Sequence, residues 1–156
     1  MKKLLVFLLI VLLLCGINLN FTKELKLSNI FPVASVEVFT SSKTFVNKFE
    51  KIDNGVGEVI FCEMNELDYI LDNIDCVSGL TLKIDLKNNS KNKILKSLDI
   101  VDFNETNFGI YGFSNIVKKV SNNKFKLKIE EKVCNFQYFE SKSCIFVGIP
   151  LLLGSY

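Results

Sequence analysis

An uninterrupted apolar run opens the chain and is followed by a long stretch of mixed pattern. Leu4 to Ile17 contains no charged and no strongly polar residue, and it follows Lys2 and Lys3. A short positive segment before an apolar core of this length is typical of a secretory signal, and the run is short for a membrane span. We therefore expect residues 1–21 to be a signal peptide or an N-terminal membrane anchor. Lysines that stay in the cytoplasm would place the remainder of the chain outside the membrane.

The pattern leaves three fates open for this leader. Small residues in the order that signal peptidase prefers are absent just after the apolar run, which favours a retained anchor over a cleaved signal. Lipid attachment at Cys15 is the least favoured, because Leu14 precedes it where lipoprotein signals usually have a small residue. Residues 22–34 are mixed in polarity and contain Pro32, so they are expected to form a spacer before one domain at 35–156.

Within 35–156, two hydrophobic periods predict two kinds of element. Alternation or compact β-branched and aromatic composition predicts strands at 35–41, 58–62, 80–86 and 124–130. In 124–130, Phe125, Leu127 and Ile129 are expected to face inward. Helical spacing of apolar residues, with Ser or Asn at the start as a cap, predicts short helices in 42–52, 65–74 and 90–98.

The C-terminal half of the chain is richer in strand signals. A hairpin is expected around the sequence NETN at 104–107, and a short helical segment follows at 114–120. Strands at 133–139 and 144–149 are expected to form a meander around the sequence ESKS. The order of elements predicts an α+β fold: an antiparallel or mixed β-sheet with two or three short helices packed on one face, preceded by the N-terminal leader helix.

Two segments are candidates for an interaction surface. Tyr111 lies between Gly109 and Gly112, where a ligand or peptide could approach the backbone, although a bulged strand is the simpler interpretation. The tail from Ile145 to Leu153 is almost entirely apolar. It is expected to be a final core strand that ends at Pro150; alternatively, Leu151, Leu152 and Leu153 stay exposed and bind a partner or the membrane.

Composition excludes several chemistries. The chain has no His and no Trp, and all 19 basic residues are Lys. It therefore lacks Ser-His-Asp triads, Cys-His pairs, imidazole metal ligands and Arg forks for phosphate. Without Lys2 and Lys3, 17 Lys balance 17 acidic residues, so the domain lacks the basic character of nucleic-acid binders. The abundance of Lys, Asn and Ile is typical of a bacterium with an A+T-rich, low-G+C genome.

Cysteine and carboxylate groups are the remaining candidates for chemistry. In an exported domain, Cys134 could bridge to Cys144 across the ESKS turn, and Cys62 to Cys76 around the helix at 65–74. Four free, buried thiols are the alternative. The cysteine spacings do not suit zinc. Acidic residues between 63 and 75 could serve acid–base chemistry or bind Ca²⁺, but helix-dipole and surface roles are favoured. We predict no catalytic, cofactor or metal site.

These observations favour an exported envelope protein, tethered to the cell membrane by its N-terminal segment or secreted after cleavage. Its expected role is that of a non-enzymatic binding or assembly module with an envelope protein or glycan as partner. An extracytoplasmic enzyme or a thiol-redox protein that uses a cysteine or carboxylate pair is the alternative. Nucleic acid is not an expected partner.

Overall fold

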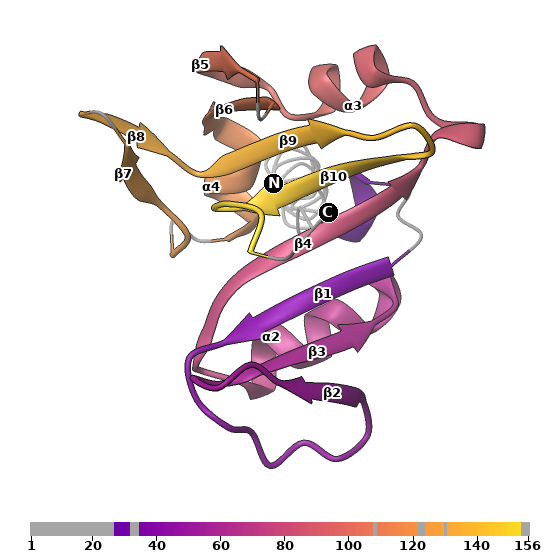
Figure 1. The fold of residues 1–156 in the computed structure, drawn as a ribbon, viewed down its shortest axis with the longest axis vertical. Helices are drawn as coiled ribbons and strands as arrows, with labels where there is room; N and C mark the ends of the chain where they lie inside the picture. Colours follow the sequence, from indigo (N-terminus) through magenta and orange to yellow (C-terminus); the bar gives the residue numbers. More distant parts are fainter. Residues whose placement is uncertain (1–26, 32–34, 108, 122–123, 130, 154–156) are drawn as a thin grey trace, which may run out of the picture.

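The computed structural model of the chain describes residues 27–31, 35–107, 109–121, 124–129 and 131–153 (Figure 1). The predicted leader, including Cys15, lies outside these residues. Within the described part, no helix is both long and apolar enough to span a bilayer.

An eight-stranded antiparallel sheet forms the centre of the fold (Figure 1). From one edge to the other, its strands are β2 (Glu50–Asp53), β3 (Glu58–Cys62), β1 (Ser35–Thr40), β4 (Val77–Asp85), β10 (Cys144–Ile149), β9 (Phe136–Glu140), β6 (Gly109–Ser114) and β5 (Ile100–Thr106). A separate hairpin pairs β7 (Leu127–Ile129) with β8 (Lys132–Cys134). The predicted α+β class is confirmed, and its sheet is antiparallel.

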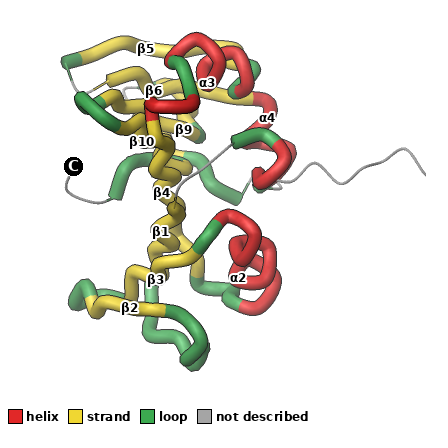
Figure 2. Tube along the Cα trace, turned by 90° about the vertical axis from the view of Figure 1, so that its right-hand side faces the viewer, coloured by secondary structure: helices red, strands yellow, loops and turns green. Residues whose placement is uncertain are grey.

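Short helices lie on one side of this sheet, as Figure 2 shows. They are α2 (Leu67–Asn73), α3 (Lys91–Ser97) and α4 (Asn115–Val120), with the 3₁₀ turns η1 (Leu27–Asn29), η2 (Met64–Glu66) and η3 (Leu86–Asn88). Local capping explains where two of them begin. The hydroxyl of Ser90 accepts the N–H of Lys93 at 3.3 Å, and that of Ser114 accepts the N–H of Val117 at 3.1 Å. We call this side of the sheet the covered face.

The core lies between the covered face and the helices. Leu80, Leu82 and Ile84 alternate along β4 and are fully buried, as are Ile70 of α2 and Ile94 of α3. Burial of each such side chain stabilises the fold by roughly 1.5–3 kcal/mol. Leu27 and Phe31 also belong to this core, so the folded unit includes residues that precede the predicted domain start at 35.

The prediction of a helix at 42–52 is wrong. Residues 41–49 form a loop and β2 follows. Phe45 and Ile52 are exposed, whereas Val46 and Phe49 pack against the core. The helical spacing is overridden by hydrogen bonds from distant residues, because the carboxylate of Glu58 accepts both the N–H and the hydroxyl of Thr44, at 2.8 and 2.6 Å.

One other expectation needs correction. The strand predicted at 124–130 is only three residues long in β7, and its Leu127 is 42% exposed rather than inward-facing. The hairpin expected around NETN, in contrast, is present: β5 continues to Thr106, which pairs with Gly109, and the turn begins at Asn107. The small β7–β8 hairpin lies outside the main sheet. The alternation of apolar and polar residues in this segment therefore does not mark a buried face.

Candidate binding face

Among the described residues, no helix lies on the side of the eight-stranded sheet opposite α2, α3 and α4 (Figure 2), and we call this side the open face. Figure 1 looks onto it, with α2 and α4 behind the strands. Antiparallel pairing places side chains of neighbouring strands in rows across this face. One row crosses six strands from β3 to β6 and consists of Phe61, Glu37, Thr81, Gly148, Gln137 and Tyr111.

Aromatic side chains gather on the open face. Phe61, Phe139, Tyr111 and Phe113 are each partly exposed, and Phe146 is nearly buried. The rings of Phe139 and Phe146 lie side by side with centroids 6.4 Å apart. The covered face, in contrast, is dominated by aliphatic residues that the helices bury. Partly exposed aromatic side chains offer apolar area at a low cost in side-chain entropy, which suits a binding surface.

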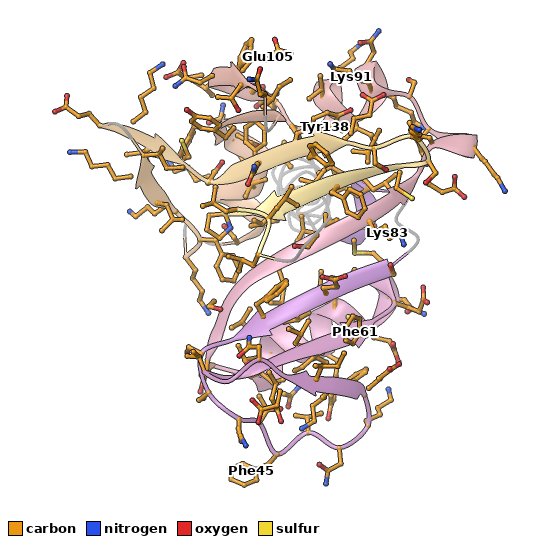
Figure 3. The ribbon with its side chains drawn as sticks, viewed as in Figure 1. Phe45, Phe61, Lys83, Lys91, Glu105 and Tyr138 are labelled. Atoms are coloured by element: carbon orange, nitrogen blue, oxygen red, sulfur yellow. The ribbon has the colours of Figure 1, made fainter. Side chains whose placement is uncertain are left out.

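Polar groups divide the aromatic surface. Lys83 of β4 is exposed, and it lies in one row with Ser35, Phe146 and Phe139. Figure 3 shows Lys83 and Phe61 on the face toward the viewer. The open face therefore combines apolar contact area with a charged group, as the rims of interfaces commonly do.

The C-terminal tail crosses this face. The N–H of Leu152 donates to Oε1 of Gln137 at 3.1 Å. Two glycines make room for the tail: a Cβ at Gly148 would collide with the backbone of Leu151 and Leu152, and a Cβ at Gly79 would lie 2.7 Å from Cδ1 of Leu153. The chain from 145 to 149 is thus a core strand, and the residues after it lie against the open face.

One buried polar atom on the open face has no hydrogen-bond partner among the residues that the structure describes. It is Oγ1 of Thr81, a residue that is 1% exposed. Thr81 is paired with Gly148, the residue beside which the tail turns back. A buried hydroxyl without a hydrogen bond costs roughly 1–3 kcal/mol, so this position is a local weakness in the open face.

The predicted interaction residues come together on this face. Tyr111 is paired with Gln137, and Gln137 holds the backbone of Leu152. Leu151 and Leu152 are partly exposed, and Leu153 is 44% exposed. Sequence reasoning missed Phe61, Phe113 and Phe139, because alternation shows that two faces exist but does not show which of them lacks helices.

The four cysteines of the domain are free thiols in the structure, so neither expected disulfide is present. Strand register explains both errors. Glu140 pairs with Ile145, so Cys144 lies at the turn end of the β9–β10 hairpin and Cys134 lies beyond its other end. Cys62 pairs with Val36 at the start of β1, whereas Cys76 lies next to Val77, which pairs with Thr40 at the end of β1. Bridges across these separations would need backbone movement.

Thiol chemistry is also disfavoured at the buried cysteines. Desolvation, followed by the charges of Glu66 and Glu63, raises the pKa of Cys62 from its ordinary value of 9.0 to about 12. Burial and the charge of Asp102 raise the pKa of Cys134. Thiolate is the nucleophilic form, so both groups are held in their unreactive form at neutral pH.

The acidic residues between 63 and 75 have structural roles or lie on the surface. Glu63 and Glu66 form a capping box at the start of η2, with Oε2 of Glu66 accepting the N–H of Glu63 at 3.2 Å. Asp68 lies in the first turn of α2, and Asp72 is exposed. Among the described residues, no three His, Cys, Asp or Glu side chains converge on a point that could hold a metal ion.

Comparisons with known proteins give no family assignment: no family model, no curated protein and no solved structure matches this chain.

Proposed function

We propose that this protein is an exported envelope protein of an A+T-rich bacterium that acts as a non-enzymatic binding or assembly module. Its N-terminal segment tethers it to the cell membrane, and its domain lies outside. The binding surface is the open face, and the partner is an envelope protein or a glycan. The leader pattern and the charge-balanced domain support the location.

The observation that carries the proposal is the partly exposed aromatic surface on a face without helices. Most aromatic residues of this size are buried when a second layer is available to cover them. On the open face, Phe61, Tyr111 and Phe139 keep part of their surface accessible, and the short tail lies over the sheet at Gln137. Partly exposed aromatic side chains interspersed with polar groups are typical of binding surfaces.

The alternative, an extracytoplasmic enzyme or thiol-redox protein, has less support. A redox pair needs two thiols in reach of each other and one with a lowered pKa. In this chain Cys62 of β3 and Cys76, just before β4, lie beside opposite ends of β1, and the pKa of Cys62 is raised. The carboxylates near α2 serve the capping box or face solvent.

Protease accessibility in intact cells tests the location. If the domain lies outside, added protease should degrade it in cells whose cytoplasmic marker proteins survive. A domain that is degraded only after the membrane is broken would contradict the proposal.

Paired alanine variants test the surface. The double variant Phe61→Ala/Tyr111→Ala should remove most of the crosslinked complexes that the wild-type protein forms in native membranes. The matched control is Val101→Ala/Phe103→Ala, which removes two exposed apolar side chains from the edge strand β5. Circular dichroism confirms that both variants are folded. Equal complex formation by the two variants would exclude the open face as the binding surface.

A further inference from the structure

A second apolar feature lies away from the open face, at the tip of the loop 41–49 between β1 and β2. The side chain of Phe45 is 100% exposed. Figure 3 shows it at one end of the longest axis of the molecule, pointing away from the rest of the protein. A single exposed apolar residue needs no explanation in general, so the question is whether the loop around Phe45 is built to present it.

The loop is held in place on both sides of Phe45. Glu58 accepts the N–H and hydroxyl of Thr44, and Nζ of Lys51 donates to the carbonyl of Thr44 at 3.0 Å. Lys51 and Glu58 form an ion pair at 3.2 Å, with side chains only 18% and 14% exposed. On the other side, Val46 and Phe49 pack against the core, and the ring of Phe49 lies 6.2 Å from that of Tyr69. The fold therefore fixes Phe45 in its outward position.

The charge of the loop suits a membrane surface. Residues 41–49 contain Lys43 and Lys48 and no acidic residue. Both lysines make ion pairs, with Asp53 at 2.8 Å and with Glu66 at 3.5 Å, but their side chains are 74% and 65% exposed. Exposed pairs of this kind are weak, so the ammonium groups can also interact with lipid phosphates. An apolar side chain between lysines is a typical pattern of insertion into the lipid interface.

The position of the loop is compatible with a nearby anchor. Six residue steps separate Phe21, at the end of the predicted leader, from Leu27 in the core, a reach of about 22 Å at most. The η1 turn that contains Leu27 contacts η2, and Glu66 of η2 is the partner of Lys48. Contacts thus join η1, the first described element after the predicted leader, to the loop that carries Phe45.

We infer that the loop 41–49 inserts Phe45 into the headgroup–acyl boundary of the membrane to which the protein is tethered. The inference rests on the membrane tether of the proposed function. A lipid interface is a better match than a protein partner, because it accepts one projecting side chain without a complementary pocket. A protein interface needs a cluster of buried contacts. With the loop inserted, the domain has two contacts with the membrane and a fixed orientation on it.

The absence of Trp from the chain allows a direct test. The full-length variants Phe45→Trp and Phe103→Trp each carry a single Trp. Phe103 is the matched control, because it is 52% exposed on β5, at the edge of the sheet opposite β2. Each variant is reconstituted into phosphatidylcholine–phosphatidylglycerol vesicles with brominated acyl chains, and vesicle flotation and Trp fluorescence are measured.

We expect both variants to float with the vesicles, and only Phe45→Trp to show blue-shifted emission and quenching by the brominated chains. If both float and Phe45→Trp is quenched no more than Phe103→Trp, the loop does not insert, while the tether stands. The same result is expected if Phe45 binds a protein partner instead of lipid. If neither variant floats with the vesicles, the tether of the proposed function fails and the loop insertion fails with it.

Discussion

The two faces of the sheet are built from different side chains. The covered face consists mainly of Leu, Ile and Val, exemplified by Leu80, Leu82 and Ile84 on β4, together with the buried rings of Phe136 and Tyr138. The open face carries aromatic residues that stay partly exposed, a lysine, and two glycines over which the tail runs. Aliphatic side chains pack densely against helices. Partly exposed aromatic side chains offer a large apolar area for contact with another molecule. The contrast supports the proposal that the open face is the binding surface, while the covered face stabilises the fold.

Thiol labelling should show the largest difference between the faces. Cys62 points to the covered face and Cys144 to the other one. With its pKa raised from 9.0 to about 12, Cys62 has a thiolate population at pH 8 about a thousandfold below that of a cysteine with its ordinary pKa. We expect alkylation of Cys62 to be slower than in the urea-unfolded chain by a comparable factor, as measured by peptide mass spectrometry. Cys144 is partly exposed and should be labelled readily in the folded protein. Similar rates at the two sites would contradict the assignment of faces.

Truncation in the covered face should have the largest effect on stability. Leu82 is completely buried at the centre of β4. Leu82→Ala should lower the free energy of unfolding by about 2–5 kcal/mol, because it removes buried apolar area and leaves a cavity. Urea denaturation measures this change. A loss below that range would mean that the helices do not pack tightly on the sheet.

The tail on the open face can be tested by filling the space that a glycine leaves. A Cβ at Gly148 would collide with the backbone of Leu151 and Leu152, so Gly148→Ala should displace the tail and cost about 1–3 kcal/mol. Thermal unfolding measures the cost. Limited proteolysis should then cleave the tail faster than in the wild type, and an unchanged cleavage rate would show that the tail does not lie on this face.

The smallest expected effect has the opposite sign. Thr81→Val replaces a buried hydroxyl that has no hydrogen bond with a methyl group of similar size. Because the unpaired hydroxyl opposes folding, the variant should be more stable by up to about 1 kcal/mol. Urea denaturation at matched protein concentration would detect the gain. A clear loss of stability would mean that Oγ1 has a partner, such as a bound water.

Much of the fold could be predicted from local pattern. Ser90 caps α3, and alternation along 80–86 identifies β4, because hydrogen bonds and burial at these places depend on residues close in sequence. The prediction of a helix at 42–52 is wrong because the carboxylate of Glu58, more than ten residues away, accepts a hydrogen bond from the backbone N–H of Thr44. The predicted disulfides are absent because the distance between cysteines depends on strand register. The register pairs Ile145 with Glu140 and places Cys134 far from Cys144. Long-range pairing is not visible in a periodic pattern.

The candidate site could be predicted only in part for the same reason. Tyr111 and Leu151–Leu153 were recognised from sequence, because they stand out in composition. Their arrangement on one face with Phe61 and Phe139 follows from the strand order, which brings β3, β10, β9 and β6 into one sheet. The exposure of Phe45 follows from the loop that replaces the expected helix.

The most direct test of the account is site-specific photo-crosslinking in living cells. A photoreactive amino acid is placed at Tyr111 on the open face or at Asp72, which is exposed on α2 on the opposite side of the sheet. We expect discrete crosslinked products from position 111 and none from position 72. Products from position 72 alone, or equal products from both positions, would contradict the assignment of binding to the open face.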